Sequence, residues 1–266
     1  MNQAVAGLLA FEKSFMTCPR RQHSAFTLVE LLVTIAIIAI LIGLMVPLLG
    51  KVSMQRGRAA TLARLRDSAA MIGIYAQDFK GSFPLPLEPG KGPWTITLAS
   101  GWKTTTDTYF ESIWLWHLAM TDRYFDGSPA PLSVFPAPRG GKGRLWGAFK
   151  MPCTLYAHAE FWNQSTRIGP VQYGATRIDQ VLYPSLKTQL VSIGHTVDAP
   201  AFPPANDPMP GTVPAVMVDG NASIFEPARF IPGVPTGEGS FPHSVHRIEF
   251  YHGLHTVDGV RGRDIQ

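Results

Sequence analysis

Four histidines near the C-terminus have a spacing that suggests chemistry. They form two H-x-x-H pairs, His243 with His246 and His252 with His255. Imidazole binds zinc and similar ions, but ligands at this spacing share one side of a helix and lie on opposite faces of a strand. The intervening stretch 247–251 is strand-like, which separates them. We therefore interpret the histidines as exposed turn residues, with His252 and His255 as candidate metal ligands.

Carboxylate side chains form a second candidate cluster. Asp198, Asp207 and Asp219 carry the oxygen atoms that calcium prefers, and Asn206 could add an amide oxygen. Their spacing does not follow the loop of an EF-hand. Asp219 opens the sequence Asp-Gly-Asn, which is typical of a hairpin turn. We interpret these residues as turn formers, with calcium binding as the alternative, and expect no other cofactor.

The sequence lacks the arrangements that are typical of enzymes. No Ser-His-Asp order, paired carboxylates or zinc-protease motif is recognisable, and the glycine-rich stretch 140–143 lacks the remainder of a phosphate-binding loop. The net charge of +4 comes from scattered basic residues rather than from a basic run. We therefore predict a protein that is not an enzyme and does not bind nucleic acid.

Glu30 is the one ionisable residue in the apolar stretch Phe26–Leu49. A helix rises about 1.5 Å per residue, so about 20 apolar residues cross the hydrocarbon layer of a membrane. The stretch is long enough to do so and predicts a single transmembrane helix in contact with membrane lipid. A carboxylate in that setting is costly unless it is paired, so we expect Glu30 to have a partner.

The residues before this stretch are polar and basic and end in the small residues Ser24 and Ala25. Together with Phe26–Leu32 (FTLVELL), they resemble the type IV prepilin signal, although that family usually has Gly in place of Ala25. The resemblance implies that a prepilin peptidase cuts between Ala25 and Phe26 and that the new amine of Phe26 is methylated. It also implies that Glu30 pairs with the N-terminal amine of a neighbouring subunit.

The chain has two cysteines, Cys18 and Cys153. Cys18 lies in the leader, so the processed chain would have one thiol and no intramolecular disulfide. We predict that Cys153 is buried and inert, which is the common state of a free cysteine in a folded domain.

The helical pattern continues beyond the apolar stretch. Apolar residues recur at spacings of three and four, which places them on one helix face. They are Leu62, Leu65, Ala69, Ile72, Ala76 and Phe79. We interpret this face as the contact with a head domain, and we place the end of the helix at Lys80-Gly81.

Two further stretches resemble pseudopilins, the filament subunits of type II secretion. Leu62–Pro86 resembles the major-pseudopilin pattern, which implies a glycine turn after the helix and an aromatic–proline pair that packs back on it. The matching residues are Tyr75, Asp78, Gly81, Phe83 and Pro84. Val216–Ser223 resembles a C-terminal segment of pseudopilin-like proteins from planctomycete and verrucomicrobial bacteria, in which a histidine precedes Asp-Gly. Here only Asp219 and Gly220 correspond, because a proline-rich insert separates them from His195.

The rest of the chain predicts a loop-rich head. We expect one short buried helix at Ser112–Thr121. Strands are expected at Trp146–Phe149, Thr188–Ile193, Ala215–Val218 and Ala222–Phe225. The proline-rich segment Asp198–Pro214 excludes helix and sheet over its length.

The expected fold is α+β and pilin-like, with a long N-terminal helix packed on a small antiparallel-sheet head. Residues 1–25 would be the removed leader, 26–49 the transmembrane half of the helix, 50–80 its soluble half and 81–266 the head.

The resemblance implies a structural subunit of a type II secretion pseudopilus or a type IV pilus-like filament. Its partners would be the prepilin peptidase and N-methyltransferase, other pilin or pseudopilin subunits, and an inner-membrane assembly platform. The protein would be single-pass in the inner membrane, with the head in the periplasm or an extracellular filament. Counting basic residues would place the head in the cytoplasm instead, and we follow the resemblance. The alternative is a membrane-anchored minor pseudopilin or surface binding module that recognises cargo or a surface.

Overall fold

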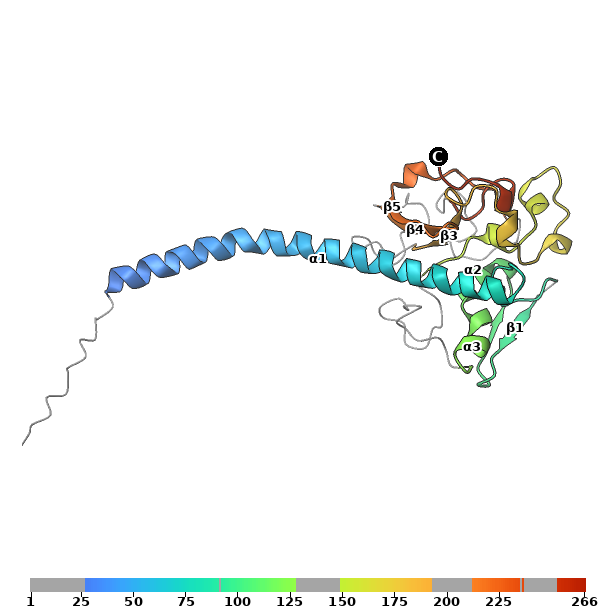
Figure 1. The fold of residues 1–266 in the computed structure, drawn as a ribbon, viewed down its shortest axis with the longest axis horizontal. Helices are drawn as coiled ribbons and strands as arrows, with labels where there is room; N and C mark the ends of the chain where they lie inside the picture. Colours follow the sequence, from blue (N-terminus) through green and yellow to red (C-terminus); the bar gives the residue numbers. More distant parts are fainter. Residues whose placement is uncertain (1–26, 91, 128–148, 193–211, 235, 237–252) are drawn as a thin grey trace, which may run out of the picture. The chain divides into compact units, whose positions relative to one another are not determined.

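The computed structural model describes residues 27–90, 92–127, 149–192, 212–234, 236 and 253–266 (Figure 1). The chain divides into two compact units, Met1–Lys51 and Val52–Gln266, which we describe separately. Several predicted features lie outside the described residues. They are Ala25, Phe26, His195, Asp198, Asp207, His252 and most of the strand expected at Trp146–Phe149.

The first unit is dominated by the N-terminal part of helix α1, which runs from Leu28 to Asp78. Its segment Leu28–Met45 is long and apolar enough to cross a membrane. The side chains of this segment are exposed, among them Ile40 and Leu44 at 64% each. So much exposed apolar surface requires apolar surroundings, which lipid or packed helices supply.

The C-terminal part of α1 belongs to the second unit and buries the predicted face. Leu65, Ala69, Ile72 and Ala76 are buried in the main core. The prediction for Phe79 was wrong, because this side chain is 39% exposed. It follows the last helical residue, and its ring stacks on Tyr75 at 4.1 Å instead of entering the core.

The helix ends where the Lys80-Gly81 pair predicted. Lys80 and Gly81 have φ values of 54° and 84°, in the left-handed region that terminates a helix. The amide of Gly81 donates to the carbonyl of Ala76 at 2.7 Å, which satisfies a carbonyl of the last turn. The chain then reverses, so that Phe83 is fully buried and Pro84 is buried beside it.

A three-stranded antiparallel sheet contains three of the predicted strands. Its order is β3-β4-β5, with β3 at Thr188–Val191, β4 at Val213–Met217 and β5 at Ala222–Phe225. The Asp219-Gly220-Asn221 turn joins β4 to β5, as predicted. Gly220 has a φ of 85°, and the side chain of Asp219 accepts the amide of Asn221 at 2.9 Å.

Pro214 corrects the expectation that the proline-rich segment contains no sheet. It is the second residue of β4 and lies opposite Ile224 of β5. Its carbonyl accepts the amide of Ser192 at 2.9 Å. The side of Pro214 that faces β3 lies opposite Ser192, past the last residue of β3 at Val191, so the missing N–H of the proline removes no hydrogen bond within the sheet.

Two other elements differ from the predictions. The expected helix Ser112–Thr121 is divided into α2, Ser112–Leu115, and α3, Leu118–Tyr124. The hairpin of β1, Trp94–Thr97, and β2, Lys103–Thr106, was not predicted. The described 3-10 helices are η1 Tyr109–Glu111, η2 Cys153–Leu155, η3 Ala159–Trp162, η4 Pro170–Gln172, η5 Ile178–Gln180, η6 Pro227–Arg229 and η9 Gly259–Arg261.

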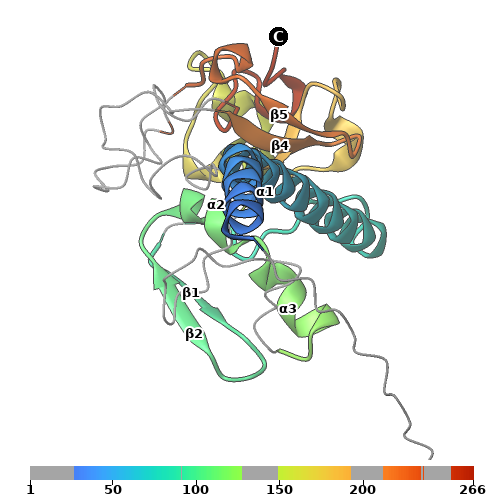
Figure 2. The ribbon, with the colours of Figure 1, turned by 90° about the vertical axis from the view of Figure 1, so that its left-hand side faces the viewer.

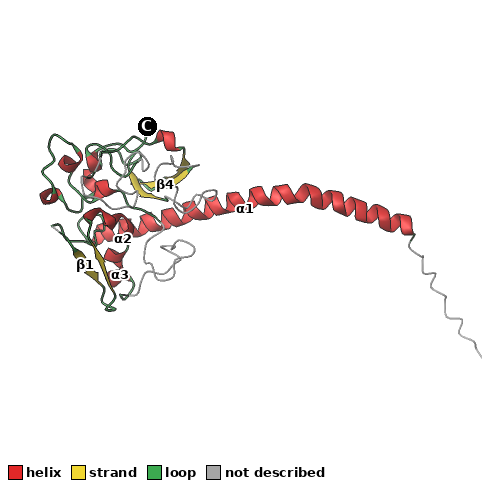
Figure 3. Cartoon of the chain, turned by 180° about the vertical axis from the view of Figure 1, so that it is seen from behind, coloured by secondary structure: helices red, strands yellow, loops and turns green. Residues whose placement is uncertain are grey.

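Within the second unit, the C-terminal part of α1 lies between the sheet β3–β5 and the elements β1, β2 and α3 (Figures 1 and 2). Arg66 donates to the carbonyl of Ala222 in β5 at 3.1 Å, and Tyr124 of α3 donates to Asp78 at 2.7 Å. The main core joins this part of α1 to aromatic rings, including the stacked pair Tyr109 and Tyr173 at 4.3 Å. The fold is α+β, with small sheets and extensive loops (Figure 3).

A buried ion pair ties the last residues of the chain to the start of β3. The ammonium of Lys187 lies 2.9 Å from one oxygen of Asp264 and 2.7 Å from the carbonyl of Gly259. The second oxygen of Asp264 accepts the amide of Thr188 at 2.7 Å, and the hydroxyl of Thr256 also contacts this carboxylate. Burial lowers the pKa of Lys187, and Asp264 opposes that shift.

Candidate functional site

Glu30 lies in the first turn of α1 and forms a reciprocal cap with Thr27. The amide and the hydroxyl of Thr27 both donate to Oε2 of Glu30 at 2.9 Å. In return, the amide of Glu30 donates to the hydroxyl of Thr27 at 3.2 Å. This is a capping box, in which side chains satisfy amides that the first turn of a helix leaves without partners.

The two oxygens of the Glu30 carboxylate differ in their surroundings. Oε2 receives both hydrogen bonds from Thr27. Within the described ranges, Oε1 accepts none, and the Glu30 side chain is exposed. Among the residues that the structure describes, the carboxylate at the start of the apolar helix is therefore held through Oε2 alone.

Glu30 lies at the start of the apolar helix, as predicted, whereas its contact with Thr27 was not predicted. The pattern Thr27-x-x-Glu30 before an apolar run is itself a signature of a capping box and could have revealed the contact. The predicted cleavage residues Ala25 and Phe26 precede the described part of the chain.

The candidate metal ligands are not brought together among the residues that the structure describes. No group of three or more His, Cys, Asp or Glu side chains that could hold a metal ion occurs there. Asp219 serves the hairpin turn between β4 and β5. Asp198, Asp207 and His252 fall in ranges outside the description.

His255 corrects the expectation that the C-terminal histidines are exposed. Its side chain is fully buried, and its ring stacks on Trp162 at 5.5 Å between centroids. Nε2 lies 3.1 Å from the sulfur of Cys153, which is a free and fully buried cysteine, as predicted. Lys150 is also buried, with its ammonium 3.8 Å from the centroid of the Trp114 ring, and burial lowers its pKa well below the ordinary value.

The residues that match the major-pseudopilin pattern lie at the end of α1 and in the turn that follows it. Tyr75, Phe83 and Pro84 are buried, and Gly81 forms the turn. Asp78 accepts the hydroxyl of Tyr124 at 2.7 Å. Desolvation, together with this hydrogen bond and the negative charge of Asp78, raises the pKa of Tyr124 to about 12.

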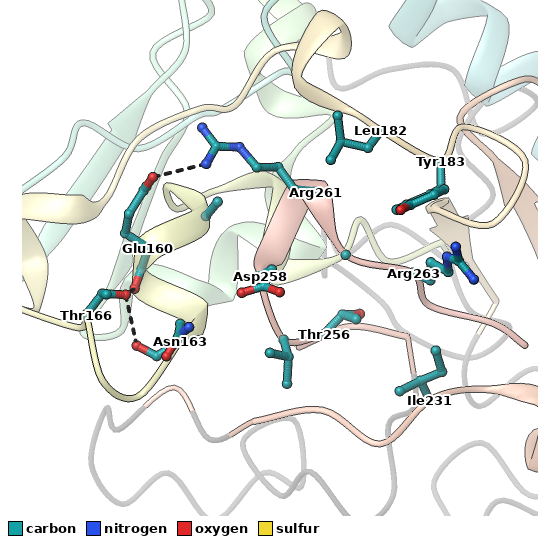
Figure 4. A pocket seen from close by; sticks show the side chains of 13 residues that line it. Glu160, Asn163, Thr166, Leu182, Tyr183, Ile231, Thr256, Asp258, Arg261 and Arg263 are labelled. Atoms are coloured by element: carbon teal, nitrogen blue, oxygen red, sulfur yellow. Dashed lines mark hydrogen bonds and ion pairs between the residues drawn. The ribbon is translucent and has the colours of Figure 1, made fainter.

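An open depression of about 600 Å³ lies on the head (Figure 4). Its lining residues are Ala159, Glu160, Asn163, Thr166, Leu182, Tyr183, Ile231, Thr256, Val257, Asp258, Arg261, Gly262 and Arg263. Ligand sites in proteins commonly have volumes in this range. This depression was not predicted from the sequence, because its residues come from four separate parts of the chain.

Charges of both signs line the depression. Arg261 pairs with Glu160 at 3.3 Å on one side, and the guanidinium of Arg263 lies 4.2 Å from the centroid of the Tyr183 ring on the other. Asp258 lies between these two groups (Figure 4). Exposed apolar side chains such as Leu182, at 62%, complete the surface. The depression offers aromatic, aliphatic and polar contacts without a strong net charge, which is a surface typical of protein interfaces.

Comparison with known proteins identifies the N-terminal segment. Residues 20–46 match the family described as the prokaryotic N-terminal methylation motif. The matched range contains Ala25, Phe26, Thr27 and Glu30 and the start of α1. No curated protein and no solved structure matches the chain. The chain thus carries a prokaryotic N-terminal methylation motif, which supports a type IV pilin-like or pseudopilin-like protein.

Proposed function

We propose that this protein is a structural subunit of a type II secretion pseudopilus or a type IV pilus-like filament. The overlap of the methylation motif with the start of the apolar helix supports the proposal most directly. The methylation motif ends within an exposed apolar helix whose first turn contains Glu30. A helix of this kind can be held in the membrane as a monomer and can pack with identical helices in a filament.

Processing before Phe26 would create the charged group that Glu30 requires. Cleavage releases the amine of Phe26, and methylation of that amine leaves its positive charge in place. In apolar surroundings the amine and the carboxylate of Glu30 are each costly alone, and pairing between neighbouring subunits neutralises both. Oε1 of Glu30, which is open in the described chain, would accept the amine of the neighbour.

The proposal assigns partners and a location as well as a role. A prepilin peptidase and N-methyltransferase would process the chain, and an inner-membrane assembly platform would add it to other subunits. The protein would be a single-pass protein of the inner membrane, with the head in the periplasm or in an extracellular filament. In this role it is structural and catalyses no reaction.

Intact mass and N-terminal sequencing of the protein recovered from membranes test the processing step. The expected chain begins with N-methylated Phe26. A chain that retains its leader in cells with an active prepilin peptidase would contradict the proposal. That result would indicate that the apolar helix serves only as a membrane anchor.

Assembly is tested separately with Glu30→Gln. This variant should be inserted and processed like the wild type but should be depleted from sheared filaments, because it lacks the charge that pairs with the amine. Normal incorporation of Glu30→Gln would exclude the pairing mechanism.

A second candidate function is a minor pseudopilin or surface binding module, and the depression on the head favours it. Tyrosine and arginine are the side chains that most often dominate binding energy at interfaces. If the head binds cargo or a surface, Arg263→Ala should weaken that binding while filament incorporation stays normal. Loss of incorporation instead would assign the depression to contacts between subunits.

A further inference from the structure

We propose that the depression on the head binds an uncharged glycan, with Asp258 and Arg263 as its main hydrogen-bonding residues. This inference rests on the second candidate function, in which the head recognises a surface. It adds the chemical class of that surface, a neutral polysaccharide, and the residues that would bind it.

The charges that line the depression balance one another. Two arginines, Arg261 and Arg263, accompany two carboxylates, Glu160 and Asp258. Arg261 and Glu160 lie 3.3 Å apart, so each already has a partner of opposite charge. A phosphate or sulfate group would meet the carboxylates, and a cation would meet the guanidinium groups, which is unfavourable in both cases. The balance favours a ligand without net charge.

Two charged groups of the depression are available for hydrogen bonds with a ligand. Among the described residues, the carboxylate of Asp258 makes no hydrogen bond or ion pair, and the guanidinium of Arg263 donates no hydrogen bond. Figure 4 shows Asp258 between Arg261 and Arg263. A ligand at this place must therefore donate to a carboxylate and accept from a guanidinium. A hydroxyl group does both, whereas a phosphate dianion only accepts and an ammonium group only donates.

Apolar side chains lie beside these polar groups. Leu182 is 62% exposed, Val257 43% and Tyr183 37%, and all three line the depression. A sugar ring carries carbon–hydrogen faces as well as hydroxyl groups, and those faces gain free energy when they leave water for an apolar surface. The depression therefore offers both kinds of contact that a sugar requires.

The polar side chains are held in place before a ligand arrives. Arg261 is fixed by its ion pair with Glu160, and the guanidinium of Arg263 lies 4.2 Å from the centroid of the Tyr183 ring. Asp258 has a φ of 61°, a left-handed conformation that aspartate adopts more readily than most residues. Side chains that are positioned in the free protein lose less conformational entropy on binding, which favours affinity.

The elements that line the depression argue against a peptide as the ligand. The lining residues belong to the 3-10 helices η3 and η9 and to loops, and none belongs to the described strands β1–β5. An extended peptide that adds to a sheet requires a strand edge, and an amphipathic helix requires a continuous apolar groove. The described lining provides neither. A glycan needs neither, because side chains alone can bind its hydroxyl groups.

Asp126 supplies a matched control for Asp258. Both are exposed aspartates in the left-handed region, with φ values of 49° and 61°. Asp126 follows α3 and does not line the depression. Asparagine also adopts the left-handed conformation, so Asp258→Asn and Asp126→Asn each keep the turn and remove one negative charge. They differ in whether the lost charge lies in the depression.

The experiment uses the full chain, purified in a zwitterionic detergent that has no sugar headgroup to compete for the site. The protein is applied to an array of neutral and anionic oligosaccharides, and calorimetric titration then gives Kd for those that bind. We expect a neutral glycan to bind with an affinity that added salt changes little. Asp258→Asn should raise Kd about tenfold, the effect of weakening hydrogen bonds to a charged group. Arg263→Lys should do the same, because lysine lacks the guanidinium fork, and Asp126→Asn should match the wild type.

Three results would overturn the proposal: a wild type that binds no neutral glycan on the array, a preference for anionic glycans, or equal Kd values for Asp258→Asn and Asp126→Asn. Thermal unfolding of each variant shows whether it is folded, and Arg263→Lys decides the outcome if Asp258→Asn is not.

Failure of the proposed functions gives different patterns. If the structural role is wrong, the wild type is not processed at Phe26 or forms no filaments, while the purified chain still binds the glycan. If the head binds protein cargo instead, that binding is lost in Arg263→Ala and no glycan binds. The second candidate function then stands and the glycan proposal falls.

Discussion

Lys187 and Asp264 lie 2.9 Å apart, ammonium nitrogen to carboxylate oxygen, and neither side chain is exposed to solvent. Removing one member of a buried ion pair leaves the other charge without compensation. Asp264→Ala should therefore lower the free energy of unfolding by about 3–5 kcal/mol, measured by urea denaturation of the full chain in detergent. Asp179→Asn is the matched control, because its partner Arg177 is exposed, and it should leave the midpoint close to that of the wild type. Equal losses of stability in the two variants would show that burial does not determine how much an ion pair contributes to the stability of this protein.

Ile72 and Ile74 are two residues apart on α1 and differ in burial. Ile72 is fully buried in the main core, whereas Ile74 is 46% exposed. Ile72→Ala should cost about 2–5 kcal/mol of stability, because it removes packed atoms and leaves a cavity. Ile74→Ala should cost much less. Thermal unfolding of both variants tests which face of α1 packs against the head. A larger loss of stability for Ile74→Ala than for Ile72→Ala would show that the opposite face of α1 is buried.

Tyr124 should titrate later than an ordinary tyrosine. Its pKa is raised to about 12, mainly by desolvation and also by the hydrogen bond and charge of Asp78. The raised pKa means that the folded state holds this proton more tightly than the unfolded state does. The resulting stability is present below about pH 10 and is lost as the pH rises from about 10 to 12. Ultraviolet difference titration of the wild type against Tyr124→Phe isolates this group, and Asp78→Asn should lower its pKa. An ordinary pKa in the wild type would argue against the contact with Asp78.

Cys153 should resist alkylation in the folded protein. The thiol is fully buried, next to Nε2 of His255, so a reagent cannot reach the sulfur. Mass spectrometry after treatment with iodoacetamide should show an unmodified Cys153 in the native protein and complete modification in denaturant. Rapid labelling of the native protein would show that the pocket around Cys153 opens readily.

Sequence patterns predicted the elements of this fold whose ends and faces are determined by residues close together in the chain. The apolar run and the three-four spacing gave α1, the Lys80-Gly81 pair gave its end, and Asp219-Gly220-Asn221 gave the turn between β4 and β5. In each case the determining interactions lie within a few residues of one another.

The features that the sequence analysis missed depend on distant or weak signals. The burial of His255 depends on Cys153, which lies 102 residues earlier. The depression on the head depends on the relative positions of four chain segments. The hairpin of β1 and β2 consists of two four-residue strands rich in threonine, too short for an alternating pattern to stand out.

At the candidate site, the sequence predicted Glu30 and its need for a partner. The contact with Thr27 was not predicted, although the Thr27-x-x-Glu30 pattern of a capping box is a local signal.

The ion pair between Lys187 and Asp264 determines when the head can finish folding as the chain is synthesised. A chain emerges from the ribosome N-terminal end first, so Lys187 appears before Asp264. Until then Lys187 has no carboxylate from Asp264, and Ile265 cannot pair with Phe230. The head can therefore complete its core only after the chain has been synthesised, and in the proposed function also exported, through residue 264.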